Sequence, residues 1–250
     1  MTTPATEAAT RSVEATGLSW WPWARVAVAA LIIAALVAQA SVSIGGAVDA
    51  HRDVATTTVN FFSFFTVLSN LLAAIVLAWA AGWALTAGRA RAGDPRGLAI
   101  ALACVTTYMI VTGIVYNTLL RGIPLPQGTT VEWANEVLHV AGPLFLLVDL
   151  LLAPRRRLLG WGAVGAVLAF PIVWLAYTLV RGPVTVNPIT GDAWWYPYPF
   201  LNPHTFANGY GTVVLYIIGI AIVIAAVAGG VVGVGRRRGR QGMRALPESE

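Results

Sequence analysis

The stretch FFSFFTVLSNLL, residues 61–72, opens the second long hydrophobic segment of the chain and constrains how that segment is buried. It places Ser63, Thr66, Ser69 and Asn70 inside an apolar run, where each polar side chain needs a hydrogen-bond partner. In a continuous helix, Ser63, Thr66 and Asn70 follow the i, i+3, i+7 spacing and share one face. The stretch therefore predicts a helix with a polar face, which is either a packing seam or a functional site.

The composition is that of a membrane protein. Of the 250 residues, 57% are hydrophobic and only 11% are charged, and the mean hydropathy of +0.71 is high for a soluble domain of this length. The single cysteine, Cys104, excludes an intrachain disulfide and a zinc site built from several cysteines. Its apolar neighbours favour a packed, inert thiol.

Six segments are long and apolar enough to cross a bilayer, which predicts an all-α bundle of six transmembrane helices. They cover residues 25–46, 61–85, 97–120, 133–153, 158–180 and 209–234. Residues 1–19 have little to bury and are expected to form a disordered cytoplasmic tail. The domain organisation is then this tail, a membrane domain over residues 20–235 and a basic cytoplasmic tail over residues 236–250.

The arginines set the expected orientation. With a cytoplasmic N-terminus, 13 of the 16 basic residues fall on the cytoplasmic side, and only Arg52, Arg121 and Arg181 fall outside. The positive-inside rule therefore predicts that both termini are cytoplasmic. These arginines form short clusters between apolar segments, so we expect them to meet anionic lipids of the inner leaflet and not a nucleic acid.

This topology brings two polar residues to the same depth. The second and fourth segments both begin at the outer face, which puts Thr66 and His139 roughly 8–9 Å below it. The third segment ends outward with Tyr116 and Asn117, and the fifth with Tyr177 and Thr178. The outer half of the bundle is therefore expected to be its polar half.

Thr66 and His139 have the chemistry of a nucleophile and its base. A threonine hydroxyl needs a neighbouring base to become nucleophilic, and a neutral imidazole can serve as one. Asn135 and Glu136 lie one turn closer to water on the His139 face, where either side chain can orient the imidazole. The competing interpretation is that Thr66 belongs to a helix-packing seam, where threonine and serine are common.

Three further features have simpler explanations. Asp149 precedes Arg155, Arg156 and Arg157 and is expected to pair with one of them. The alternation Asp49, His51, Asp53 is metal-like only in composition, and a solvated loop is the better interpretation, so no metal site is predicted. His204 lies in the long outer connection, where nothing in the sequence fixes its position.

The same connection carries Trp194, Trp195, Tyr196 and Tyr198. These aromatic residues form either an interfacial belt or a lid over an acyl chain, and composition does not separate the two.

Three motifs in this order resemble a known family. They are F-T-V-L-S-N-L at Phe65–Leu71, N-E-V-L-H-V-A-G-P at Asn135–Pro143 with Asp149 beyond it, and W-Y-P from Trp195 with a leucine at Leu201. Together they resemble the androgen-induced and androgen-dependent TFPI-regulating family of six-span membrane hydrolases, in its bacterial branch. The resemblance covers residues 25–235 in segment order. Ser69 stands where animal members have asparagine, and Glu136 where they have a second histidine.

The resemblance implies an intramembrane threonine hydrolase acting on fatty acid esters of hydroxy fatty acids or a related bacterial lipid ester, without a cofactor. It also implies a multi-pass location in the bacterial cytoplasmic membrane. Its nucleophile matches Thr66 and its histidine matches His139. The candidates for support or oxyanion stabilisation are Asn70, Tyr116, Asn117, Asn135 and Glu136. The candidates for substrate lining are Ser69, Tyr177, Trp195 and Tyr196. The alternative is a non-catalytic bundle that binds or transports lipid.

Overall fold

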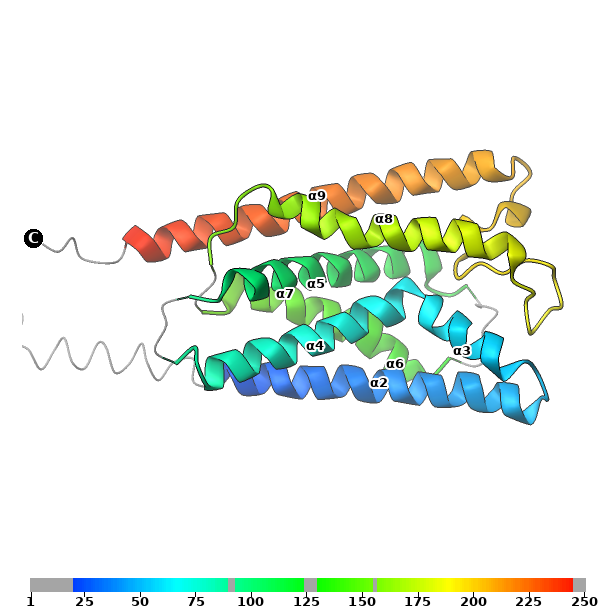
Figure 1. The fold of residues 1–250 in the computed structure, drawn as a ribbon, viewed down its shortest axis with the longest axis horizontal. Coiled ribbons are helices and arrows are strands. Elements are labelled where there is room, and N and C mark those ends of the chain that lie inside the picture. The colour runs from blue at the N-terminus through cyan, green and yellow to red at the C-terminus, as the bar shows by residue number, and fades with distance from the viewer. Residues whose placement is uncertain (1–19, 90–92, 124–129, 155–156, 245–250) are drawn as a thin grey trace, which may run out of the picture.

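The computed structural model describes residues 20–89, 93–123, 130–154 and 157–244, with the side chains of 239–244 left out, so the predicted tail over residues 1–19 lies outside it. The described residues form helices and no strand (Figure 1). The α-helices are α2 (Trp21–Asp49), α3 (Val54–Ser63), α4 (Phe65–Leu85), α5 (Arg96–Val115), α6 (Glu132–Glu136), α7 (Gly142–Leu152), α8 (Ala163–Arg181) and α9 (Tyr210–Arg244). Two π-helical segments, η1 (Tyr116–Leu120) and η2 (Val137–Ala141), extend α5 and join α6 to α7. Single 3₁₀ turns are η3 (Gly182–Val184), η4 (Pro199–Leu201) and η5 (Pro203–Thr205).

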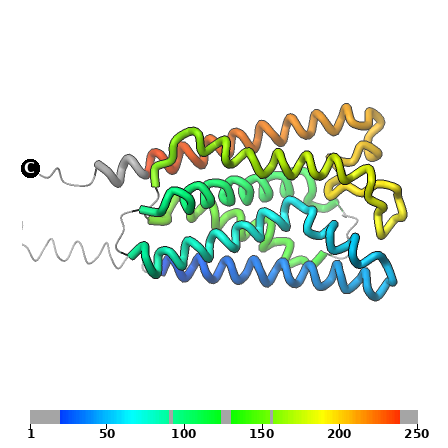
Figure 2. The backbone as a smooth tube through the Cα atoms, viewed as in Figure 1, coloured from blue at the N-terminus to red at the C-terminus, as the bar shows by residue number. Residues whose placement is uncertain are grey.

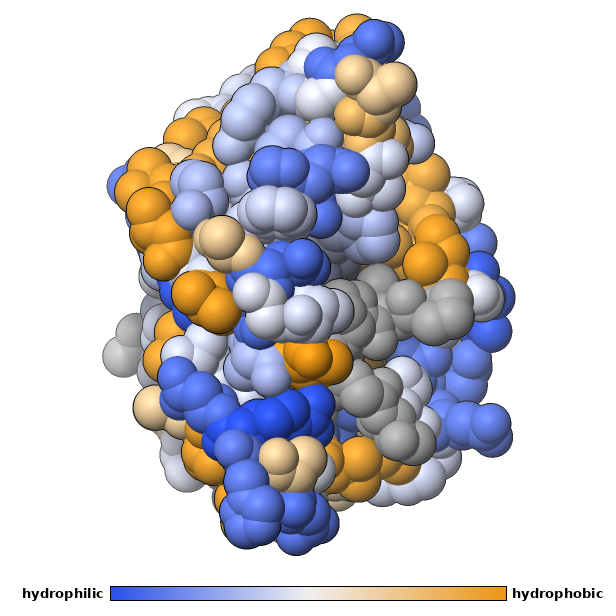
Figure 3. Space-filling model, turned by 90° about the vertical axis from the view of Figure 1, so that its right-hand side faces the viewer, coloured by the Kyte–Doolittle hydropathy of each residue, from blue (hydrophilic) through white to orange (hydrophobic). Residues whose placement is uncertain are grey.

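Six helical units are long and apolar enough to span a membrane, which confirms the predicted fold class and makes the chain a multi-pass membrane protein. Helix α5 lies at the centre and packs against α4, α7, α8 and α9, while α2 covers α4 (Figure 1). The first and last described residues lie at one end of the bundle, here called the arginine-rich end (Figure 2). The opposite loop end is mostly polar on its surface, with hydrophobic residues along its flanks (Figure 3).

The predicted second span is two helices and not one. Phe64 has an extended backbone (φ −70°, ψ 130°), so α3 ends at Ser63 and α4 begins at Phe65. The expected common face of Ser63, Thr66 and Asn70 is therefore wrong, because the break turns Ser63 away. The Ser63 hydroxyl instead contacts the Tyr177 hydroxyl at 2.9 Å. Thr66 now lies in the first turn of α4, where backbone N–H groups have no partner within the helix.

Proline explains why η2 is π-helical at His139. Pro143 has no N–H to donate to the carbonyl four residues earlier, which is that of His139, and its ring crowds that oxygen. The freed His139 carbonyl accepts a hydrogen bond from the Asn117 amide of η1 at 3.3 Å. At the same place Gly113 lets α5 approach closely, since a Cβ there would lie 3.1 Å from the Pro143 side chain.

The same arrangement occurs in α8 at Pro171. This residue leaves the Val167 carbonyl without its helical donor, and the buried Tyr108 hydroxyl of α5 donates to that carbonyl at 2.9 Å. Helix α8 continues through Pro171 as one helix from Ala163 to Arg181. The tyrosine thus satisfies the backbone and ties α8 to α5.

Asp149 is bound by two residues of α2 that the sequence did not single out as its partners. Its carboxylate accepts two hydrogen bonds from Arg25 of α2, at 2.8 and 3.1 Å, and one from the Trp21 indole at 2.7 Å. Both charged side chains are buried. Arg155 and Arg156 lie outside the described residues. A residue of the first span, 124 positions away, therefore neutralises this carboxylate.

The predicted basic tail begins as a continuation of α9, which runs to Arg244. Arg236 donates to the Leu159 carbonyl at 2.7 Å, and Arg238 donates to the Leu150 and Ala153 carbonyls at 2.7 and 2.9 Å. Guanidinium groups are favourable beside the unpaired carbonyls at a helix C-terminus, here that of α7. These arginines therefore hold the end of α9 against the bundle.

Candidate functional site

The Thr66 hydroxyl and the His139 imidazole meet at the loop end of the bundle. Thr66 Oγ1 lies 3.3 Å from His139 Nε2, and His139 Nδ1 lies 2.9 Å from the Asn135 backbone oxygen. A carbonyl oxygen only accepts, so Nδ1 carries the proton and Nε2 of the neutral ring is the acceptor. The Thr66 hydroxyl therefore donates to His139, which is the arrangement of a nucleophile and its general base.

The orienting group is a backbone carbonyl. The sequence suggested the side chain of Asn135 or Glu136 for this role, and the Asn135 side chain instead donates to the Tyr116 hydroxyl. The wider turn of η2 keeps the Asn135 carbonyl, four residues before His139, within reach of the ring. In the part of the chain that the structure describes, the hydrogen bonds of the imidazole go to the Asn135 carbonyl and the Thr66 hydroxyl, and not to a carboxylate.

Tyr198, from the long connection after α8, completes the contacts of Thr66. Its hydroxyl accepts a hydrogen bond from the Thr66 backbone N–H at 3.1 Å and lies 3.2 Å from Thr66 Oγ1. Since Thr66 donates to His139, the Tyr198 O–H donates to Thr66 Oγ1. Burial raises the pKa of the Tyr198 phenol, so the group stays protonated and remains a donor.

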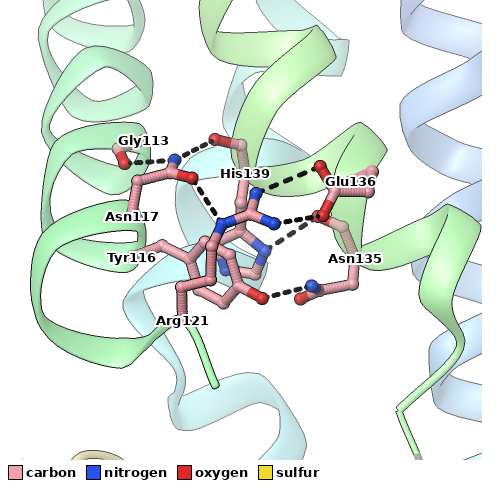
Figure 4. A network of polar contacts seen from close by, with 7 residues as sticks. All are labelled: Gly113, Tyr116, Asn117, Arg121, Asn135, Glu136 and His139. Carbon is pink, nitrogen blue, oxygen red and sulfur yellow. Dashed lines mark hydrogen bonds and ion pairs between the residues drawn. The ribbon is translucent and has the colours of Figure 1, made fainter. Parts of the chain in front are cut away.

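Tyr116 stacks on the other side of the imidazole, with ring centroids 3.9 Å apart and planes 23° apart. Arg121 lies over Tyr116 at 5.2 Å and donates to both carboxylate oxygens of Glu136, at 2.9 and 3.1 Å. The same guanidinium donates to the Asn117 side chain at 2.8 Å. Figure 4 shows Arg121 linking η1 to α6 above the stacked rings.

Asn70 ties together the helical segments that carry Thr66 and His139. Its side-chain amide donates to the Thr66 carbonyl at 2.9 Å and to the Leu138 carbonyl at 3.1 Å. Both amide protons are therefore directed at backbone oxygens. Asn117 is likewise occupied, with its amide donating to the Gly113 and His139 carbonyls. Of the oxyanion candidates named from the sequence, only Tyr116 and Asn135 line a cavity that contains Thr66.

Two cavities meet at Thr66. The larger, here called the apolar cavity, has a volume of about 370 Å³ and lies between α5, α8 and α9. Its lining residues Ile172, Ala221 and Ala225 are exposed on the bundle surface, so it opens sideways. The smaller polar cavity, about 100 Å³, contains Gln39, Ser43, Asn135 and His139 in its wall. Thr66 and Tyr198 line both.

The four residues predicted to line the substrate site lie outside both cavities. Ser69 is fully buried and bonds to the Thr66 carbonyl and the Thr112 hydroxyl, as a seam residue between α4 and α5 does. Tyr177 contacts Ser63. Trp195 packs on Phe64 and on the Arg181 guanidinium, and the Tyr196 hydroxyl contacts that of Tyr210.

The other polar residues singled out from the sequence have structural contacts. Asp53 accepts hydrogen bonds from the Thr56 backbone and hydroxyl, which caps α3 and lowers the pKa of the carboxyl. His204 stacks on Trp194 at 3.6 Å. Within the described residues, no three His, Cys, Asp or Glu side chains gather as metal ligands would.

Sequence reasoning missed Tyr198 as part of the site. The sequence left the motif WWYPYPF as either an interfacial belt or a lid over an acyl chain, and it folds inward, with Trp195, Tyr196, Tyr198 and Phe200 all buried. The sequence feature that could have identified Tyr198 is its pair of flanking prolines, because Pro197 and Pro199 fix the backbone on both sides of it.

Comparison of the chain with protein-family models, curated proteins and solved structures found no match. The family resemblance therefore stays a prediction that rests on three short motifs and their order. The geometry around Thr66 stands independently of it.

Proposed function

We propose that this chain is an intramembrane lipid ester hydrolase with Thr66 as the nucleophile and His139 as the general base. The observation that carries the proposal is the 3.3 Å contact of Thr66 Oγ1 with His139 Nε2, in a ring whose other nitrogen donates to a carbonyl. The contact lies at the wall of an apolar cavity that opens toward lipid. The substrate class is a fatty acid ester, as the family resemblance also implies.

In the first half-reaction, the Thr66 oxygen attacks the ester carbonyl and its proton passes to His139 Nε2. When the carbonyl re-forms, the bond to the alcohol oxygen breaks and that oxygen takes the proton from His139. The product is an acyl-threonine. Water then attacks this acyl group, gives a proton to His139 and releases the fatty acid, and the proton returns to Thr66.

The negative charge on the carbonyl oxygen needs donors in the transition state. The Tyr198 hydroxyl is the donor nearest to Thr66 Oγ1 and has its hydrogen directed there before attack. Thr66 also lies in the first turn of α4, where the partial positive charge of the helix N-terminus favours an anion. We assign Tyr198 as the principal stabiliser of the oxyanion.

The positive-inside distribution of the arginines supports a cytoplasmic location for the arginine-rich end, and with it for both termini. In a bacterial cytoplasmic membrane, the site then faces the outer leaflet. Cysteine accessibility at the two ends of the described chain, measured in intact cells with an impermeant maleimide, tests this orientation.

Labelling with a fluorophosphonate probe tests the proposed function. We expect the purified protein to be labelled and to release fatty acid from a lipid ester, and both signals to disappear in Thr66→Ala and His139→Gln. Thr118→Ala is the matched control, because Thr118 is exposed and bonds only to the Ile114 carbonyl. Equal labelling of Thr66→Ala and wild type would reject the assignment. Fatty acid binding without ester cleavage would favour the non-catalytic lipid-binding alternative.

A further inference from the structure

The two cavities at Thr66 differ in which catalytic group they contain. Thr66 lines both cavities, whereas His139 lines the polar cavity and not the apolar one. Tyr116 lies between the imidazole and the apolar cavity, since it stacks on the ring and lines both spaces. A molecule bound across Thr66 therefore has one part in the apolar cavity and a chemically different part in the polar cavity.

The reaction determines which part lies where. His139 must give its proton to the leaving alcohol oxygen, so that oxygen has to lie within hydrogen-bond reach of Nε2. The alcohol part is then on the His139 side, in the polar cavity. The acyl part stays bonded to Thr66 and extends into the apolar cavity. The water that releases the acyl group has to approach from the side that the alcohol has left, for the same reason.

The apolar cavity has the dimensions for an acyl chain. Its wall on α9 runs from Ile217 to Ala225, a length of about 12 Å. The hydrocarbon core of a bilayer is ~30 Å thick, and one leaflet makes up half of it. The cavity therefore extends along most of the length of an acyl chain in one leaflet. Ile172 and Ala225 are exposed at its opening, which lets a chain enter from the side.

The polar cavity is suited to a small alcohol. Its volume of about 100 Å³ is little more than a quarter of the volume of the apolar cavity, about 370 Å³. Ser43 and Gln39 of α2 form part of its wall, and the Gln39 amide donates to the Ser43 hydroxyl at 3.2 Å. A second long alkyl chain exceeds this volume, although Phe61, Leu120 and Ile123 also form part of the wall.

We infer that the substrate is a fatty acyl ester of a compact polar alcohol of glycerol size, with its acyl chain in the apolar cavity and its alcohol in the polar cavity. The inference rests on the proposed function and narrows it. An ester of a hydroxy fatty acid, whose alcohol part carries a second long chain, is a poor substrate.

The test compares two palmitoyl esters on the full-length protein in lipid nanodiscs. We expect kcat/KM for monopalmitoylglycerol to exceed that for the palmitic ester of hydroxystearic acid by about tenfold or more, as pocket size alone can discriminate. A ratio near one, or a preference for the hydroxystearic ester, overturns the inference while the hydrolase proposal stands. If neither ester is cleaved and the fluorophosphonate probe does not label Thr66, the proposed function itself fails and the inference with it.

Two pairs of variants separate the cavities. Ala225→Phe adds bulk at the last α9 residue of the apolar cavity's wall, and is expected to shift the preferred acyl length of a glycerol ester series from palmitoyl toward shorter chains. Ala226→Phe is its control, exposed on the same helix and outside the cavity. Ser43→Leu reduces the polar cavity and is expected to lower kcat/KM for every glycerol ester by about tenfold without changing the preferred length. Ser41→Leu is the exposed control. If Ser43→Leu changes the preferred acyl length and Ala225→Phe does not, the assignment of the two cavities is wrong.

Discussion

The Tyr198 hydroxyl lies 3.2 Å from Thr66 Oγ1 and 3.1 Å from the Thr66 backbone nitrogen, so one phenol contacts both polar groups of the proposed nucleophile. The contact exists because α4 begins at Phe65, which leaves the Thr66 N–H without a helical acceptor. A continuous helix through Phe64 would use that N–H and would leave the phenol no place beside Thr66. The break in the second span is thus what admits Tyr198 to the site.

Tyr198→Phe removes the oxyanion donor and keeps the ring. We expect kcat for ester cleavage to fall by about 10²–10³, as the loss of one oxyanion donor does elsewhere, with KM little changed. Single-turnover and steady-state assays with one ester measure both parameters. Tyr196→Phe is the control, because that hydroxyl contacts Tyr210 and lines neither cavity. A Tyr198→Phe protein that retains kcat within twofold would remove Tyr198 from the mechanism.

We expect the Arg121–Glu136 pair to hold Tyr116 and His139 in position and to contribute little to the stability of the fold. Both side chains are about half exposed, at 46% and 50%, so solvent screens the pair and it adds little to folding stability. Arg121 nevertheless covers Tyr116, which stacks on His139. Arg121→Gln should therefore lower kcat by a few fold while the unfolding midpoint stays unchanged.

Salt and charge reversal provide the controls for that pair. Exposed charges are screened at high ionic strength, so the wild-type rate should approach that of Arg121→Gln as salt is raised to about 1 M. The double variant Arg121→Glu with Glu136→Arg should recover part of the lost rate. If the double variant is slower than both single variants, the pair does not position the site.

The sequence was sufficient to predict six spans, apart from the break at Phe64, and the meeting of Thr66 with His139. Long apolar segments and the count of arginines give helix number and direction, and direction gives depth. Depth does not determine how each helix is rotated about its own axis. Here that rotation is fixed by the packing of Gly113 on Pro143 and by the hydrogen bonds of Asn70 to the Thr66 and Leu138 carbonyls. Those contacts join residues far apart in the chain, and one sequence does not reveal them.

The substrate-lining candidates show where sequence patterns are insufficient. Trp195 and Tyr196 have the composition of an interfacial belt, yet both are buried against other residues of the loop end. The apolar cavity is lined by Tyr198 and Phe200 of the same connection and by ordinary aliphatic residues such as Leu168 and Ile220. In a membrane helix such residues face lipid, core or cavity alike, so hydrophobicity does not distinguish a binding wall from its surroundings.

The start of α3 should respond to acid. Asp53 is the N-cap of α3, and its hydrogen bonds to Thr56 hold the pKa of the carboxyl below its usual value of 3.8. A carboxyl with a lowered folded pKa stabilises the protein above the unfolded pKa, and this contribution is lost as pH falls through the folded value. We expect Asp53→Ala to lower the unfolding midpoint at neutral pH and to converge with wild type at a pH below the folded pKa of this carboxyl. A difference that persists unchanged at that pH would show that the charge of Asp53 plays no part.

The Arg25–Asp149 pair is expected to dominate stability at the arginine-rich end. The side chains are 4% and 0% exposed, and Asp149 also accepts from the Trp21 indole. Removing one partner of a buried pair leaves the other charge uncompensated, which typically costs about 3–5 kcal/mol. Asp149→Leu should therefore lower the unfolding midpoint strongly, as followed by thermal denaturation in detergent micelles. Asp192→Leu, at an exposed aspartate, should not.

The double variant Arg25→Met with Asp149→Leu separates a lost pair from an uncompensated charge. Two apolar side chains of similar volume restore packing without a buried charge, so the double variant should recover most of the stability lost in Asp149→Leu. Ester hydrolysis should stay near the wild-type rate in it, because the pair lies at the end of the bundle opposite Thr66 and His139. A double variant as unstable as the single one would mean that the geometry of the pair, and not its charge balance, holds α2 against α7.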